Sequence, residues 1–238
     1  MTMQVAMVGK DGIVLASDTM WLSSGELAGQ IRVPLPATKI RISDAGDVAV
    51  SQARNMETCS LIAREVVQLD GKQISAYRLE EVANDILGRA GKRADVQCLV
   101  VSAKPRPRLF RLWSMPERKP GSRRMSARAE CAEISGSAIA GDDQNAAVFL
   151  LQAYYKEGLT LHYLIPLAAH LVLAAGKLNS GAINGLEVVG CTRNDGCRHL
   201  STETIKRLKL LSRKLDKQTQ SLLSAHGEEF AYAPNVIG

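Results

Sequence analysis

The chain has few aromatic side chains, 4% of its 238 residues, and its five cysteines are scattered. No two cysteines form a C-x-x-C pair, and none has a histidine at the spacing of a zinc ligand. The pattern therefore predicts no metal site, and no cofactor is expected. We expect five reduced thiols that mostly fill the core, namely Cys59, Cys98, Cys131, Cys191 and Cys197.

Long apolar runs are also missing from the sequence. The first residues do not form the basic segment and unbroken apolar stretch of a signal peptide, and no segment approaches the roughly 18 apolar residues of a membrane span. We therefore expect a cytoplasmic protein with no membrane partner. The length and the apolar share of 46% predict one domain over residues 1–238, with a core at about 2–223 and an extended tail at about 224–238.

The net charge of +6 comes largely from one segment, residues 104–128. No known DNA- or RNA-binding motif accompanies this segment, so we expect a solvated hairpin or a subunit contact there and no nucleic-acid partner. Its charged side chains are Lys104, Arg106, Arg108, Arg111, Arg118, Lys119, Arg123, Arg124 and Arg128, against Glu117 alone.

The order of elements predicts the class of fold. Alternating or continuous apolar runs indicate strands, and apolar residues at helical spacing indicate helices. The resulting order is strands, helix pair, strands, helix pair, strands and a last helix, which favours an α+β protein with antiparallel sheets covered by helices. Strands are expected at 4–8, 12–18, 39–43, 47–51, 96–103, 108–115, 129–141 and within 185–201; helices are expected at 54–69, 79–87, 142–156 and 160–177.

The last helix has an apolar stripe and a basic opposite face. The stripe predicts packing on the helix's own domain or on a neighbouring subunit, and the lack of Trp and Phe argues against a membrane surface. The stripe consists of Ile205, Leu208, Leu211 and Leu215.

The opening stretch, MTMQVAMVGKDGIVLASD, places a threonine directly after the initiator methionine. Removal of Met1 would leave Thr2 with both a hydroxyl nucleophile and a base, its own α-amino group. That amine titrates at about 7.7–8.0 in short peptides, so a useful share is neutral at cellular pH. The sequence thus offers a self-contained threonine nucleophile.

Asp18 and Lys39 are two charged residues that strand pairing could bring to Thr2. If the first two strands pair as a hairpin, Asp18 at the end of the second returns to the level of Thr2, and Lys39 can lie between them. Its ammonium would favour the deprotonated forms of the Thr2 amine and hydroxyl. Taken separately, Asp18 could simply end a strand and Lys39 could be an exposed charge on an edge strand.

These residues carry a resemblance to a known family. The stretches TMQVAMVGKDGIVLASD and TKIRISDAGDVAVS resemble the front half of proteasome β subunits and the bacterial HslV peptidase, both N-terminal nucleophile hydrolases. The chain is most similar to the small bacterial homologues named for betaproteobacteria. The resemblance implies a four-layer αββα sandwich and assigns Thr2, Asp18 and Lys39 to the catalytic positions.

The same resemblance implies a supporting set with several departures. Ser51 stands where the family has a glycine whose amide forms the oxyanion hole. Gly141-Asp142 replaces a Gly-Ser pair, and Asn179-Ser180 replaces an Asp-Ser pair. From the residues alone, Asp142 is expected to cap a helix and Ser180 to be a loop hydroxyl.

Substrate contacts are implied by the same alignment. Leu22, Ser51 and Ala53 would lie where the family pairs its backbone with a substrate strand. Trp21 and Arg41 would lie near the pocket that reads the substrate side chain.

The function implied is a self-compartmentalising threonine endopeptidase that acts on peptides or unfolded proteins. The chain would assemble with itself in stacked hexameric or heptameric rings, with a double heptamer favoured. The sequence leaves a partner ATPase undecided. Two alternatives stay open: an amidase acting on small or modified peptides, and a ring-forming scaffold whose site is silenced by the departures at Ser51, Asp142 and Asn179.

Overall fold

The structure is a computed structural model, and it describes residues 2–22, 34–90, 95–118, 125–180 and 182–226. Two five-stranded antiparallel sheets and five α-helices form the fold, in agreement with the α+β class expected. The first sheet has the strand order β10-β1-β2-β11-β12. Its strands are β1 (Met3–Val8), β2 (Ile13–Ser17), β10 (Ser137–Gly141), β11 (Glu187–Thr192) and β12 (Gly196–His199).

The second sheet has the order β5-β6-β7-β8-β9, and a separate two-stranded sheet joins β3 to β4. The strands of the second sheet are β5 (Ile40–Ile42), β6 (Val48–Arg54), β7 (Val96–Ser102), β8 (Arg108–Arg118) and β9 (Met125–Ile134). The short pair consists of β3 (Met20–Leu22) and β4 (Pro34–Pro36). The basic segment therefore includes β8 and the first residues of β9, which pair as a hairpin, one of the two structures expected for it.

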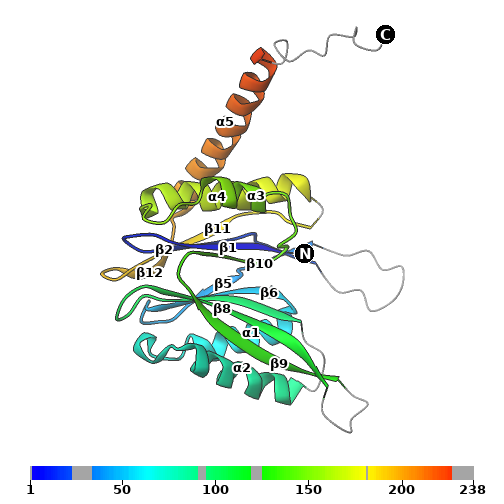
Figure 1. The fold of residues 1–238 in the computed structure, drawn as a ribbon, viewed down its shortest axis with the longest axis vertical. Helices are drawn as coiled ribbons and strands as arrows, with labels where there is room; N and C mark the ends of the chain where they lie inside the picture. The colour runs from blue at the N-terminus through cyan, green and yellow to red at the C-terminus, as the bar shows by residue number, and fades with distance from the viewer. Residues whose placement is uncertain (1, 23–33, 91–94, 119–124, 181, 227–238) are drawn as a thin grey trace, which may run out of the picture.

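The helices lie on the outer faces of the two sheets. Figure 1 shows α3 and α4 along the first sheet and α1 and α2 along the far face of the second, while α5 projects beyond these layers. The helices are α1 (Met56–Val66), α2 (Ala76–Ala90), α3 (Val148–Tyr154), α4 (Leu161–Leu178) and α5 (Thr202–His226), with a short 3₁₀ turn at Gly71–Gln73.

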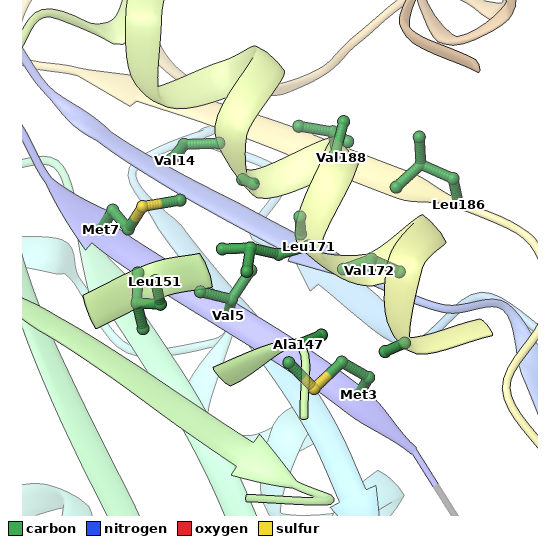
Figure 2. Packing of buried hydrophobic residues seen from close by; sticks show 14 of the residues in the cluster. Met3, Val5, Met7, Val14, Ala147, Leu151, Leu171, Val172, Leu186 and Val188 are labelled. Atoms are coloured by element: carbon green, nitrogen blue, oxygen red, sulfur yellow. The ribbon is translucent and has the colours of Figure 1, made fainter. Parts of the chain in front are cut away.

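Strand β1 is buried on both faces, which explains its nearly continuous apolar sequence. Met3, Val5 and Met7 point toward α3 and α4, where they pack with residues such as Leu171 (Figure 2). The intervening Ala6 belongs to a different apolar cluster, which lies between the two sheets. A third cluster joins the second sheet to α1 and α2.

The chain between β9 and α3 differs from the expectation. The stretch expected as one strand is divided at residues 135–136: β9 belongs to the second sheet, and β10 belongs to the first. The expected helix at 142–156 is also wrong in its start, because α3 begins at Val148. Asp142 does not cap α3: its amide donates to the Thr2 carbonyl at 2.7 Å, which extends the β1–β10 contact and delays the helix.

Helix α4 begins after Thr160 as expected, although the Thr160 side chain makes no capping hydrogen bond and Pro166 lies within the helix. Contrary to the sequence expectation, α4 is long and apolar enough to span a membrane, and it is the one such helix in the described part of the chain. It packs on β1, β2 and β11 and against α5. These contacts bury one face of the helix.

The expectation of five reduced cysteines is wrong for two of them. Cys191 and Cys197 face each other directly on β11 and β12 and form a disulfide bond. The tight turn between these strands brings the two side chains together. Cys59, Cys98 and Cys131 are free thiols.

Candidate active site

The β1–β2 hairpin positions Asp18. Gln4 pairs with Ser17 in this hairpin, so Asp18 follows directly at the level of the chain start. Its carboxylate accepts hydrogen bonds from the amides of Met3 at 3.0 Å and Met20 at 3.1 Å. Asp18 is fully buried, and these two donors fix its orientation.

Lys39 joins Asp18 to Thr2. Its Nζ donates to Asp18 Oδ2 and to Thr2 Oγ, each at 2.8 Å. The ammonium also lies 4.6 Å from the centroid of the Trp21 ring, within the range of a cation–π contact. A charged lysine is therefore held without exposure to solvent by a carboxylate, a hydroxyl and an aromatic face.

Burial disfavours the charge on both members of this pair. It lowers the pKa of Lys39 from its ordinary value, and the nearby Asp18 carboxylate opposes this effect. Burial likewise raises the pKa of Asp18, with Lys39 acting in the opposite direction. A lysine with a lowered pKa beside a hydroxyl can stabilise a developing alkoxide and exchange a proton with it.

Thr2 itself is buried against the end of β10. Met3 pairs with Gly141, whose φ of 95° is a conformation that suits glycine. A Cβ at Gly141 would overlap the Thr2 carbonyl, so glycine is required for this close approach. The Gly141 amide donates to Gln97 Oε1 at 2.8 Å, which ties the position to β7 in the second sheet.

Ser51 lies on β6, with its side chain between the sheets. Its Oγ donates to Gln4 Oε1 at 2.7 Å and accepts from the Leu99 amide at 3.3 Å. Successive amides of a strand point to opposite sides. Because the Gln52 amide donates to the Lys39 carbonyl, the Ser51 amide faces β7. An oxyanion role for that amide stays a prediction.

The other supporting residues are placed less directly. Asp142 contributes its amide to Thr2, while its carboxylate accepts from Asn145 Nδ2 at 3.1 Å. Asn179 ends α4, where its carbonyl accepts from the amides of Ala182 and Ile183. Ser180 lines a cavity of about 330 Å³ between α4 and α5. Among the described contacts, none joins the side chain of Asp142 or Ser180 to Thr2.

The predicted substrate residues lie in different environments. Trp21 is nearly buried beside Lys39, and Ala53 is buried between the sheets. Arg41 is exposed on β5. Leu22 pairs with Pro34 in the β3–β4 ribbon, and its side chain lies outside the described part of the structure. Their contacts with substrate stay predictions.

The sequence analysis did not identify Glu187 as a residue that contacts Lys39. The Glu187 carboxylate accepts from the amides of Lys39 and Ile40 at 3.0 and 3.1 Å. Its signal in the sequence was a single acidic residue inside the apolar run GLEVV. Burial raises the pKa of Glu187. A single acidic residue inside an apolar strand is a sequence signal for such a buried carboxylate, and buried carboxylates are frequent at functional sites.

No metal cluster is formed within the described ranges, where no three His, Cys, Asp or Glu side chains gather to hold an ion. The chemistry described above depends on Thr2, Lys39 and Asp18.

Comparison with known proteins adds a likeness of fold. No protein-family model matches the chain, and no curated protein matches its sequence. Two solved structures of Anbu from Hyphomicrobium sp. strain MC1 are similar to it. A Gly-1 mutant has a TM-score of 0.64 at 15% identity and covers 93% of this chain and 97% of its own. A second crystal form has a TM-score of 0.63 at 15% identity, with coverages of 92% and 97%. The chain therefore shares the fold of these Anbu structures.

Proposed function

We propose that this chain is a threonine peptidase of the N-terminal nucleophile type, with a four-layer αββα sandwich. The observation that carries the proposal is the position of Lys39 Nζ, 2.8 Å from both Thr2 Oγ and Asp18 Oδ2. The proteasome-like fold shared with Anbu supports the same class of hydrolase. Membership of the betaproteobacterial group remains part of the proposal.

The mechanism begins with removal of Met1, which frees the Thr2 amine. Thr2 Oγ then attacks the substrate carbonyl while the amine accepts the hydroxyl proton, and an acyl-enzyme forms as the leaving amine takes that proton. Lys39 stabilises the negative charge that develops on Oγ. Water next attacks the ester, which restores the hydroxyl and releases the acid product. Backbone amides near Ser51 are proposed to bind the oxyanion.

Self-association in stacked rings, with a double heptamer favoured, is proposed for the assembly. Support comes from α5, which buries Leu208 but leaves Leu210 and Leu222 62% exposed. Exposed leucines along a projecting helix are suited to burial against a neighbouring subunit. Peptides or unfolded proteins would then reach enclosed sites, with or without an ATPase.

The proposed location is the cytoplasm, with no nucleic-acid or membrane partner. The disulfide bond between Cys191 and Cys197 weighs against this location, because disulfides usually persist in oxidising compartments. The location therefore rests on the sequence pattern alone, and the single-domain organisation is proposed on the same basis.

Peptide cleavage tests the proposal. We expect the purified chain to cleave members of a peptide library detected by mass spectrometry, Thr2→Ser to cleave them more slowly, and Thr2→Ala to cleave none. Cleavage that persists in Thr2→Ala would refute the mechanism. If Thr2-dependent hydrolysis is restricted to small amides, the amidase alternative is correct, and if wild type hydrolyses neither class, the scaffold alternative is favoured.

A further inference from the structure

Glu187 connects the two sheets next to the candidate active site. It is the first residue of β11 and lies opposite Ser17, one residue before Asp18. Its side chain leaves the first sheet and reaches the start of β5 in the second. There one carboxylate oxygen, Oε2, accepts hydrogen bonds from two successive amides, those of Lys39 and Ile40.

These two amides belong to the edge of the second sheet. Both amides donate to Glu187 at the beginning of β5 and not to a neighbouring strand, and a buried amide without a partner is costly. Both Lys39 and Ile40 are fully buried, so Glu187 supplies the acceptor that their amides need. Hydrogen bonds to an ionised acceptor are stronger than those between neutral groups, which makes this a firm anchor.

Glu187 holds the backbone of Lys39, and the backbone position determines where the ammonium can lie. The Lys39 amide is held by Glu187, and the Lys39 carbonyl is held by the Gln52 amide at 3.0 Å. With the backbone fixed on both sides, the flexible side chain has to satisfy only the two contacts at Nζ. A shift of the backbone would move the ammonium away from Thr2 or Asp18.

We propose that Glu187 is a positioning residue for the Lys39 ammonium: it fixes the Lys39 backbone and adds a negative charge that helps keep the lysine protonated. This inference rests on the proposed function for its catalytic consequence. The effect of Glu187 on Lys39 itself can be measured without any catalytic activity.

Among the described residues, few charged or titratable groups lie near Glu187. Lys39 faces it from the second sheet, and His199 on β12 places Nδ1 3.4 Å from the other carboxylate oxygen. Asp18 contacts the same ammonium. The Glu187 charge raises the pKa of Lys39 and so opposes the effect of burial. A cavity of about 500 Å³ is lined by Glu187, His199 and Thr38.

Two substitutions separate the hydrogen bonds of Glu187 from its charge. Glu187→Gln keeps a carbonyl oxygen for the amides but removes the charge, whereas Glu187→Ala removes both. Glu203→Ala is the matched control, because Glu203 is exposed on α5 and forms an ion pair with Arg207, on the same helix. Thermal unfolding of each variant checks that it is folded.

The first measurement is an NMR titration of the Lys39 side chain. We expect Glu187→Gln to lower the pKa of Lys39 relative to wild type, and Glu203→Ala to leave it unchanged. An unchanged Lys39 pKa in a folded Glu187→Gln variant would overturn the proposal. This result does not depend on whether the protein is an enzyme.

The second measurement is the rate at which a threonine-directed acylating inhibitor modifies Thr2, followed by intact mass against pH. We expect Glu187→Ala to react about 100-fold more slowly, as for a misplaced catalytic group, and Glu187→Gln to lie between Glu187→Ala and wild type. The acylation rate is expected to fall at high pH, where Lys39 loses its proton, and in Glu187→Gln this fall should occur at a lower pH than in wild type. If the variants lose thermal stability but keep the wild-type acylation rate and its pH dependence, Glu187 has a structural role only. No adduct in wild type would instead refute the proposed function.

Discussion

Lys39 Nζ lies 2.8 Å from Thr2 Oγ although the two residues are 37 positions apart in the sequence. Two sheets meet at this hydrogen bond, because Thr2 precedes β1 in the first sheet and Lys39 precedes β5 in the second. The β1–β2 hairpin brings Asp18 to the same point. The site therefore depends on the packing of the two sheets against each other.

Removal of Lys39 is expected to abolish acylation and to destabilise the fold. Lys39→Met leaves the buried Asp18 carboxylate without its cation, which costs about 3–5 kcal/mol for a broken buried pair. The double variant Asp18→Asn/Lys39→Met removes both charges and should regain much of that stability without regaining activity. Denaturant unfolding and inhibitor labelling of the three proteins check this. Equal stability of the single and double variants would contradict a coupled buried pair.

Gly141→Ala is expected to destabilise the protein and slow acylation. The new Cβ would overlap the Thr2 carbonyl, and the positive φ is unfavourable for alanine. We expect a loss of about 1–3 kcal/mol, typical of overpacking. Gly88→Ala is the control, because nothing lies within 4 Å of its added Cβ and helix α2 should gain about 1 kcal/mol. Similar unfolding midpoints for the two variants would refute the close approach.

The acylation rate should fall on the alkaline side below the ordinary lysine pKa of 10.5, because burial lowers the pKa of Lys39. Below the actual pKa the ammonium is present and supports Thr2, and above it the positive charge is lost. Trp21→Leu removes the cation–π contact that favours the ammonium, so this fall should shift to lower pH. A pH–rate profile tests both expectations, and a shift to higher pH in Trp21→Leu would contradict them.

Alkylation under denaturing conditions distinguishes the cysteines. Without reductant we expect Cys59, Cys98 and Cys131 to react, and after reduction all five cysteines should react. Mass spectrometry counts the modified sites. Labelling in intact cells before lysis would show whether Cys191 and Cys197 are bonded there. Five labels without reductant would support the reduced state that a cytoplasmic location favours.

The sequence predicted those parts of the site that depend on local pairing. A short hairpin determines where Asp18 lies relative to Thr2, and the short apolar run MQVAMV indicates the buried strand that begins it. The prediction that Lys39 contacts this hairpin came from the family resemblance. A local sequence pattern does not show how one sheet packs against another.

Other features depended on contacts between distant segments. Glu187 meets Lys39 across 148 residues, and the Gln4–Ser51 bond joins the two sheets. The start of α3 was misplaced because the Asp142 amide is engaged by Thr2 and is not part of the helix. Helical spacing carries no information about such a tertiary hydrogen bond.

Intact-mass spectrometry of the purified chain tests the central claim most directly. We predict loss of Met1 and, after incubation with a threonine-directed inhibitor, a single adduct that is absent in Thr2→Ala. Retention of Met1, or an adduct that persists in Thr2→Ala, would contradict an enzyme whose nucleophile is the first residue of the mature chain.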